Sequence, residues 1–496
     1  MKKITLVLVV VAVTAAGFFV GRFTAPAPSF DLQTVDTSNP MDAAFEAFIQ
    51  AQRDTLALYK THENFDDPLA AAEAYRGVLY TIVGSIKSGA LMSHEYLRAM
   101  RGVDWTSKAG LDNPDNNYFF ALLDDEGSYR LYGSRGNTTQ LIFQLVIGVP
   151  GVGNAGSSTN VDVLYDEDLV LDEEGNFEII VSPERPDDAK NWMENAPGAE
   201  SLLVRFTHSD WETERIDPLY IERLDTDGQP PEPLTEASLA AGLKRTSQSM
   251  YDRTASWIQL ADRMWSLVPN NSIFNMRVTP GGLVGQYSAF GNFKLAPDQS
   301  MLIEFGNTGA PYMGIQLGNR WFVSMDYENH TSTLNMAQLG CREDESRCYA
   351  LISLEDPGVA NWLDPAGHDE GLIFMRWQGL DSPPTKADQP RTRVLSAEEL
   401  ATYIENLPKV SPEERRKAVQ VRRRAAHERF GGWVSLRALE TLSLVRRLPD
   451  ETRKQASHHD AKFGLLSWIG EGLTALEAPL HLGNHLIGRQ RLALRG

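Results

Sequence analysis

The chain alternates between two kinds of hydrophobic pattern. Apolar residues recur with helical spacing over residues 41–62 and again after Asp67-Pro68, where Asp67 can cap a helix and proline suits its first turn. From Asn113 the pattern changes to short apolar runs separated by turns, which is typical of strands. Residues 235–267 are helical again, and a second series of strands follows. The pattern therefore predicts an α+β chain with two antiparallel β domains.

The domain boundaries are placed where the pattern changes and at Pro-rich segments. The C-terminal β domain is expected to be a jelly-roll-like sandwich, with helices before, between and after the two β domains. No short-period repeat is visible, and the β domains share only a loose plan of helix followed by strands. The predicted segments are a signal anchor at 1–23, a tether at 24–40, a helical region at 41–110, the first β domain at 111–228, a linking helix at 234–268, the second β domain at 270–380, a linker at 381–395 and a basic helical tail at 396–496.

The N-terminus has the features of an export signal. Lys2 and Lys3 precede an almost wholly apolar run from Ile4 to Val20, and a basic start followed by an apolar core is typical of such signals. The run has about 17 residues, near the lower limit for a membrane-spanning helix. Because the candidate cleavage sites are weak, we favour an uncleaved anchor over a cleaved signal peptide. The rest of the chain would then face the periplasm or the cell exterior.

Charge narrows the class of partners. The formal net charge of −19 argues against a nucleic-acid-binding protein. The charge is uneven, since residues 386–496 carry 20 Lys and Arg against 13 Asp and Glu. Such a basic tail can lie against anionic lipid or against an acidic protein body, and a solvated helical face would explain it equally well. The oligomeric state is left open.

The two cysteines, Cys341 and Cys348, predict a disulfide. They flank a charged loop, with apolar residues on both sides, which resembles a hairpin with a cysteine at each inner end. Facing residues of a hairpin lie close enough for a disulfide, and an oxidising compartment would keep it formed. Two thiolates without a further ligand pair nearby make a poor zinc site.

The common catalytic and cofactor motifs are absent or incomplete. Residues 151–156 match a dinucleotide fingerprint, but the next residues do not begin a helix, which the fingerprint needs to direct amide groups at a pyrophosphate. His481 and His485 could share a helical face, yet no third ligand is evident. The sequence therefore predicts no cofactor and no metal site.

The densest group of polar and aromatic residues lies in two segments of the second β domain, 316–335 and 361–376. Histidines near carboxylates titrate near neutral pH, so the candidates for acid–base chemistry are Asp326, His330, Asp364 and His368. The candidates for ligand contacts are Tyr327, Asn335, Trp362 and Arg376. We expect most of these residues to line one pocket at a loop-rich rim, with both histidines beside the same cavity. A rim held only by turns and Trp packing is the alternative.

Three stretches resemble the bacterial domain-of-unknown-function 1214 family. They are 112–116 with 129–136, 316–335, and 361–376, and Asn361-Trp362-Leu363-Asp364 followed by Gly367-His368 is especially typical. The resemblance covers most of residues 100–380 and implies a jelly-roll-like sandwich in the C-terminal half. It implies no activity and no catalytic residue. The anchor and the basic tail lie outside it.

These observations leave three hypotheses for function. The first is an envelope-anchored protein that binds a small polar or amphiphilic ligand, a saccharide or a lipid head group, on a β sandwich. The second is a hydrolase or transferase that uses the Asp/His/Arg cluster, since two carboxylates suffice for glycoside chemistry. The third is a structural partner at the membrane surface that uses the basic C-terminal helices. Whether the protein is an enzyme stays open at this point.

Overall fold

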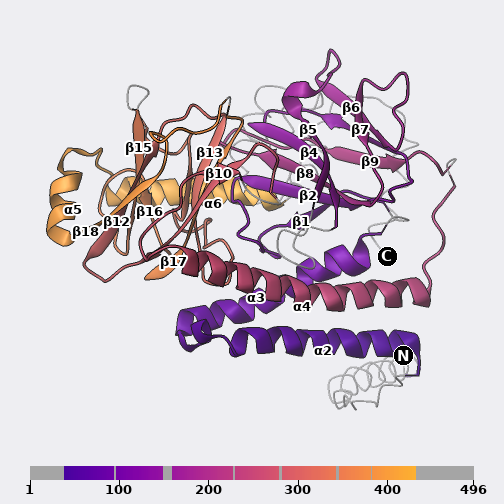
Figure 1. The fold of residues 1–496 in the computed structure, drawn as a ribbon, viewed down its shortest axis with the longest axis horizontal. Helices are drawn as coiled ribbons and strands as arrows, with labels where there is room; N and C mark the ends of the chain where they lie inside the picture. The colour runs from indigo at the N-terminus through magenta and orange to yellow at the C-terminus, as the bar shows by residue number, and fades with distance from the viewer. Residues whose placement is uncertain are drawn as a thin grey trace, which may run out of the picture.

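The computed structural model describes residues 38–93, 97–148, 159–226, 229–278, 282–341, 346–380 and 382–431. The predicted anchor, most of the tether, the segment 151–156, and His481 and His485 lie outside these ranges. Two β units lie side by side, and a layer of helices packs along one side of both (Figure 1). The fold class is α+β, as predicted.

Helices α2 (Pro40–Lys60), α3 (Pro68–Ile86) and α4 (Glu236–Leu267) form the helical layer. A 3-10 helix, η1 (Glu63–Asp66), joins α2 to α3, and a π-helical turn, η2 (Lys87–Leu91), follows α3. Asp67 caps α3 by accepting a hydrogen bond from the Ala70 amide at 2.7 Å, as the sequence predicts. Among the described residues, no helix is long and apolar enough to cross a membrane.

The first β unit consists of two sheets with strand orders β1-β2-β8-β4-β5 and β7-β6-β3-β9. Neighbouring strands are antiparallel except β6 and β7, which are parallel. Because β1 begins at Met100, the predicted helical region 41–110 ends too late. The strands are β1 (Met100–Val103), β2 (Asn116–Leu122), β3 (Tyr129–Ser134), β4 (Gln140–Ile147), β5 (Thr159–Tyr165), β6 (Asn176–Ser182), β7 (Asn191–Glu194), β8 (Ala199–Thr207) and β9 (Leu219–Arg223), with a 3-10 turn η3 (Asp166–Asp168) after β5.

The second β unit also has two sheets, with orders β10-β11-β17-β13-β14 and β16-β15-β12-β18. Here β15 and β16 are the parallel pair. The predicted linker 381–395 is wrong in its last third, because β18 pairs with β12 there and extends the sandwich. The strands are β10 (Arg277–Val278), β11 (Tyr287–Lys294), β12 (Gln299–Gly306), β13 (Tyr312–Gly318), β14 (Thr333–Asn335), β15 (Arg347–Ser353), β16 (Trp362–Leu363), β17 (Glu370–Gln378) and β18 (Arg391–Ser396).

The two units have the same topology, which the loose shared plan of the sequence only suggested. Each strand of the first unit corresponds to the strand numbered nine higher, in both sheets and in the parallel pair. The segments at β7 and β16 both carry Asn-Trp. Asn191 accepts from the Val170 amide at 2.7 Å and donates to the Glu178 carbonyl at 2.9 Å. Asn361 makes the matching bonds to Gly340 and Tyr349 at 2.8 and 3.1 Å. The asparagine side chain therefore fixes the same crossover in each unit.

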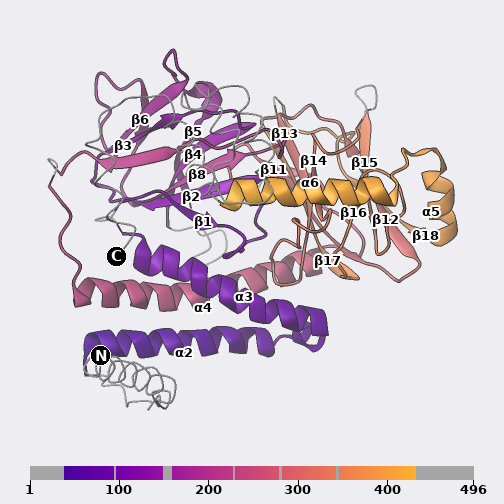
Figure 2. The same ribbon diagram turned by 180° about the vertical axis from the view of Figure 1, so that it is seen from behind.

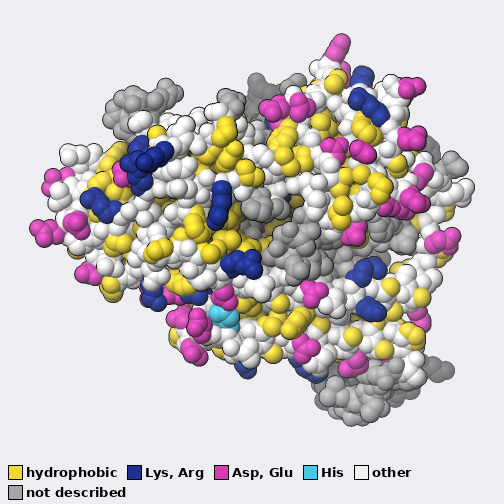
Figure 3. Space-filling view, viewed as in Figure 1, with side chains coloured by type: hydrophobic (Ala, Val, Ile, Leu, Met, Phe, Trp, Pro, Cys, Tyr) yellow, Lys and Arg dark blue, Asp and Glu magenta, His cyan; other side chains and the backbone are white. Residues whose placement is uncertain are grey.

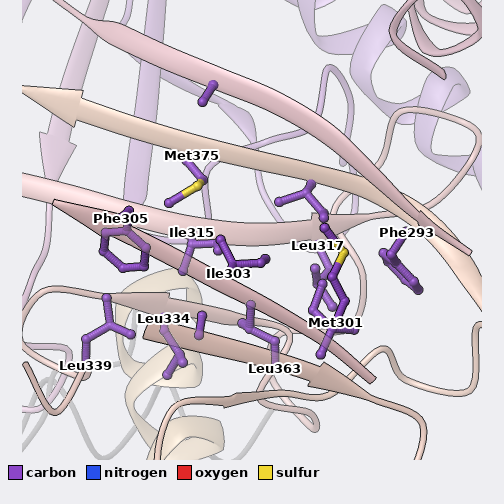
Figure 4. Close-up of a cluster of buried hydrophobic side chains, with 14 of the residues drawn as sticks. Phe293, Met301, Ile303, Phe305, Ile315, Leu317, Leu334, Leu339, Leu363 and Met375 are labelled. Carbon is purple, nitrogen blue, oxygen red and sulfur yellow. The ribbon is translucent and has the colours of Figure 1, made fainter. Parts of the chain in front are cut away.

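The core of the second unit lies between its two sheets. Figure 4 shows apolar side chains from both sheets meeting there, among them Phe293, Ile303, Phe305, Ile315 and Met375. These positions alternate with outward-facing ones along each strand, as half-buried strands require. Burying each such side chain contributes about 1.5–3 kcal/mol relative to leaving it exposed.

The C-terminal helices are α5 (Ala397–Tyr403) and α6 (Pro412–Gly431), with a 3-10 turn η4 (Ile404–Asn406) after α5. Figure 2 shows α6 lying across both β units. Arg422 donates to the Thr333 carbonyl of the second unit at 2.6 Å, and Arg429 donates to the Pro114 carbonyl of the first at 2.8 Å. Both arginines are buried. Part of the basic character of the tail therefore serves to join the two units.

The disulfide between Cys341 and Cys348 is present, with 5.2 Å between the Cα atoms. The expected hairpin is wrong, because β14 and β15 belong to different sheets. The disulfide instead joins the segment after β14 to Cys348 in β15, the strand that pairs with β12. It closes a connection that crosses from one sheet of the sandwich to the other.

Candidate functional site

The predicted site residues do not line one pocket. His330, Asp364 and Asp326 lie near the surface of the second unit, Tyr327, Asn335 and Arg376 lie in the interior, and Trp362 packs under α6. His368 alone of the eight borders a described cavity. We expected both histidines near a shared cavity; His368 lines one, and His330 is not among its lining residues.

His330 and Asp364 form a surface pair, with 2.8 Å between Nδ1 and the carboxylate. The pKa of His330 is raised, mainly by this hydrogen bond. Burial alone would raise the pKa of Asp326, but hydrogen bonds from Asn329 outweigh it, and the pKa is lowered. The Asp326 carboxylate accepts from the backbone amides of Glu328 and Asn329 at 3.2 and 3.0 Å. It therefore holds a turn, in the way that the alternative interpretation of the rim expected.

The interior candidates belong to a polar network between the two units. The Asn335 amide donates to the Asp115 carboxylate at 2.8 Å and to the Ser209 carbonyl at 3.0 Å. Arg376 donates to the Leu111 carbonyl at 2.7 Å and also bonds Gln316. Both residues are buried. Their partners are protein groups, so these side chains link the segment before β2 to the second unit.

Tyr327 and Trp362 are packing residues. The ring of Tyr327 is buried, with the Lys108 ammonium 3.9 Å from its centroid and Trp211 beside it. Trp362 is 7% exposed, its indole donates to the Ser353 carbonyl at 3.0 Å, and the Arg415 guanidinium lies 5.0 Å from its ring. Because protein groups cover both rings, neither ring has a free face for a ligand.

Asp115 is the centre of the interior network, and our sequence reasoning did not single it out. Its carboxylate accepts from Trp211 at 2.7 Å, from Asn335 at 2.8 Å and from the Tyr312 hydroxyl at 2.7 Å. Burial lowers the pKa of Arg422 and Arg429 to about 10, and the Asp115 charge opposes this lowering. The stretch 112–116 is one of those that carry the family resemblance, so a structural role explains that part of the pattern.

His368 lies in a cavity of about 530 Å³ between the helical layer and the second unit. The wall is formed by η1 and the start of α3, the end of α4 with the segment after it, and the ends of β11, β13 and β17 together with the loop before β17. The lining residues are Glu63, Asn64, Asp67, Leu69, Ala70, Glu73, Trp265, Asn270, Lys294, Arg320, Gly367, His368, Asp369 and Glu370. We call this cavity the helix–sandwich cleft.

A histidine and a carboxylate face each other in the helix–sandwich cleft. His368 Nε2 and Glu73 Oε2 are 3.1 Å apart, yet neither atom has a hydrogen-bond partner of good geometry. Burial lowers the pKa of His368, but the contact with Glu73 and the Pro365 carbonyl outweigh it, and the pKa is raised. The histidine therefore holds a proton more readily than a free one and partly neutralises Glu73.

A stacked arginine forms the other side of the cleft. The Arg320 guanidinium lies 3.9 Å from the Trp265 ring centroid and donates to Glu370 at 2.7 Å. Lys294 donates to the same carboxylate at 2.7 Å. The Arg320 side chain is 9% exposed, and its Nε lacks a hydrogen-bond partner, as does the Asn64 side-chain nitrogen. The lining of the cleft thus contains donors that have no hydrogen-bond partner.

Carboxylates outnumber cations in the helix–sandwich cleft. Glu63, Asp67, Glu73, Asp369 and Glu370 face Lys294, Arg320 and His368. Figure 3 shows acidic side chains gathered beside a histidine at the end of the helical layer that holds the turn between α2 and α3. Within the described ranges, no group of three or more His, Cys, Asp or Glu side chains is arranged to hold a metal ion.

Sequence reasoning missed most of this cleft. Glu73, Trp265 and Arg320 come from three segments far apart in the chain, and no local motif connects them. Only Gly367-His368 stood in a segment that the sequence singled out. The sequence held one signal for this cleft, the group of acidic residues just before α3: Glu63, Asp66 and Asp67.

No family model and no curated protein matches this chain. An uncharacterized protein from Burkholderia cenocepacia has a similar structure, with a TM-score of 0.64 and 26% identity over 74% of this chain and 98% of that one. A protein from Vibrio parahaemolyticus gives a TM-score of 0.37 at 10% identity, covering 72% of this chain and all of that one, which is too distant to carry an argument. The Burkholderia protein therefore shows that a similar fold, covering 74% of this chain, occurs in a solved structure.

Proposed function

We propose that this chain is an extracytoplasmic binding protein whose helix–sandwich cleft takes a small polar ligand with an amino group beside hydroxyl or phosphate oxygens. An amino sugar and the ethanolamine part of a lipid head group share this chemistry. The observation that carries the proposal is the pair of Glu73 and His368 in the lining of the cleft, with 3.1 Å between Oε2 and Nε2. An ammonium group would give the Glu73 carboxylate a further donor.

The other carboxylates of the cleft support an amine. Glu370 is already paired with Lys294 and Arg320, and Asp67 caps α3. Glu63, Glu73 and Asp369 remain, with His368 as the cation that compensates them when it is protonated. Arg320 Nε and the Asn64 amide would donate to the oxygens of the same ligand. Donors and acceptors on opposite walls suit a ligand that has both.

The location and the family belong to the proposal as well. An oxidising compartment would maintain the Cys341–Cys348 disulfide. The basic and then apolar start of the chain would anchor the protein in the membrane, with its body in that compartment. We also propose membership of the domain-of-unknown-function 1214 family, on the stretches 112–116 and 361–376. The Asn361-Trp362 part of that pattern has a structural task in this fold, as Asn191-Trp192 does in the first unit.

The two alternatives have less support. A hydrolase or transferase built on Asp326, His330, Asp364, His368 and Arg376 needs all of these groups in one cluster, but Arg376 is buried and bonds the Leu111 carbonyl and Gln316. A membrane-surface role for the basic helices needs free cations. In the described part of α6, Arg415, Arg422 and Arg429 are engaged with the protein body, so only the exposed cations Arg416, Lys417 and Arg424 could take part.

The test is a binding measurement with the whole protein. Isothermal titration is carried out with glucosamine, phosphoethanolamine and glucose. The first two distinguish an amino sugar from a lipid head group, and glucose lacks the amino group. We expect at least one amine to bind and glucose to bind much more weakly. Glu73→Gln should weaken amine binding by roughly 10- to 100-fold, the equivalent of about 1.5–3 kcal/mol for a hydrogen bond to a charged group.

The matched control is Glu355→Gln, which changes an exposed carboxylate on the second unit away from the cleft. It should leave binding unchanged. Equal binding of glucose and glucosamine, or an equal effect of the two substitutions, would overturn the proposal.

A further inference from the structure

A cavity of about 640 Å³ lies on the first β unit, away from the helix–sandwich cleft. It is open on the outer face of the sheet β7-β6-β3-β9, and its lining includes Arg130, Tyr132, Glu178, Asp188, Lys190 and Tyr220. Figure 3 shows apolar and acidic side chains next to each other over the region of β6, β7 and β9. We call this surface the open face.

The equivalent face of the second unit is covered. There α5 and η4 pack over β12, β15 and β18, and Leu400, Tyr403 and Ile404 contact a buried apolar cluster. Leu302 of β12 lies opposite Leu351 of β15 in this cluster. The duplicated topology therefore identifies which surface of the first unit lacks its cover.

The open face has different chemistry at the matching positions. Arg130 lies opposite Ile180, where the second unit has Leu302 opposite Leu351. An apolar helix like α5 would bury the Arg130 guanidinium, which is costly without a partner. Arg130 instead contacts Glu178 at 3.3 Å and lies 4.5 Å from the ring centroid of Tyr132. The face is thus built for a polar occupant.

Two tyrosines stack on each other on this face. Tyr132 lies opposite Tyr220 of β9 and opposite Glu178 of β6. The two rings stack with centroids 5.2 Å apart and an interplanar angle of 19°. Tyr220 is 51% exposed. Sugar rings combine apolar C–H faces with hydroxyl groups, and the exposed Tyr220 ring beside carboxylate, guanidinium and ammonium groups matches both.

We propose that the open face is a binding site for an oligosaccharide, with a sugar ring on Tyr220 and hydroxyl groups bonded by Glu178, Asp188 and Lys190. This site is separate from the helix–sandwich cleft and does not depend on the function proposed for it. The volume suits a segment of about two to three sugar residues, since ligand pockets of 300–1,000 Å³ hold molecules of that size.

The experiment measures binding of cellohexaose, maltohexaose, chitohexaose and hexagalacturonate to the whole protein by isothermal titration. We expect at least one to bind, and Tyr220→Ala to weaken that binding by about tenfold or more. The matched control, Tyr251→Ala, removes an exposed tyrosine on α4 and should have no effect. Arg130→Leu, which restores the apolar character of the covered face, should also weaken binding.

Circular dichroism melting of each variant shows whether it is folded before its binding is interpreted, and Arg130→Leu decides if Tyr220→Ala fails to fold. Failure of all four hexasaccharides to bind would overturn the proposal. Binding that is insensitive to Tyr220→Ala and Arg130→Leu would do so too. Binding lost on Glu73→Gln would place the sugar in the other cleft and contradict the assignment to the open face.

Discussion

Replacing Asp115 with alanine tests whether the interior network joins the two β units. The carboxylate is fully buried and accepts three side-chain hydrogen bonds, from Trp211, Asn335 and Tyr312. Trp211 belongs to the first unit, and the other two donors belong to the second. The substitution would leave the buried Trp211 indole N–H without an acceptor, and Asn335 and Tyr312 would each lose one hydrogen bond. It would also remove a favourable charge from two arginines of α6.

The expected loss follows from these contacts. An unsatisfied buried donor costs about 1–3 kcal/mol, and the buried arginines also lose a favourable charge interaction. We therefore expect a loss of about 2–4 kcal/mol in the free energy of unfolding. Asp115→Asn should cost about half as much, because its remaining oxygen can still accept from Trp211 and Asn335 while the charge is lost.

Urea unfolding followed by tryptophan fluorescence measures both variants. Asp298→Asn, at an exposed turn position between β11 and β12, is the control and should change the free energy by less than about 0.5 kcal/mol. If Asp115→Ala unfolds too readily to be measured, the Asp115→Asn value still decides. A loss below about 1 kcal/mol for both variants would refute the network as the link between the units.

Three further predictions concern the second unit. Gly371→Ala would place a Cβ 2.7 Å from the Gly318 carbonyl oxygen and from Met325 Cε, so it should destabilise by about 1–3 kcal/mol in urea, while Gly340→Ala should be neutral. Reducing the Cys341–Cys348 disulfide should lower the free energy of unfolding by about 2.5 kcal/mol for so short a loop, and a Cys341→Ala/Cys348→Ala variant should show no response to reductant; an equal response in both would contradict this. The raised pKa of His330 means that its pair with Asp364 stabilises fully below the unfolded value of about 6.5 and loses this effect as pH rises through the folded pKa. The stability difference between the wild type and His330→Gln should therefore shrink from pH 6 to pH 9, by less than about 1 kcal/mol because the side chain is 38% exposed, and a difference that grows with pH would be inconsistent.

The fold class was predictable because it rests on local patterns. The helical spacing before residue 62, the Asp67-Pro68 cap and the turns between strands are each decided within a few residues. The duplication was not visible in the same way, because topology depends on which strands pair across long distances. Its trace in the sequence was short: Asn191-Trp192 and Asn361-Trp362, at the parallel strand of each unit.

The site was only partly predictable, for a related reason. Density of polar residues along the chain does not imply that they converge, because successive residues of a strand point to opposite faces and turns hold their own carboxylates. Asp326 and Asp364 therefore serve turns, and Asn335 points inward. His368 reaches a cleft whose key partner, Glu73, lies on a helix in another part of the sequence. Such a pair can be found only after folding places the helical layer against the second unit.

The most direct test of the helix–sandwich cleft is the pKa of His368, measured by NMR of the imidazole with and without saturating glucosamine. Assignment follows from the resonance lost in His368→Gln. Glu73 helps to raise the pKa of His368 in the free protein, so an ammonium group bound to Glu73 should lower that pKa. Ligand binding would then release a proton and strengthen as pH rises. A His368 pKa that stays unchanged or rises when glucosamine is added would contradict the account.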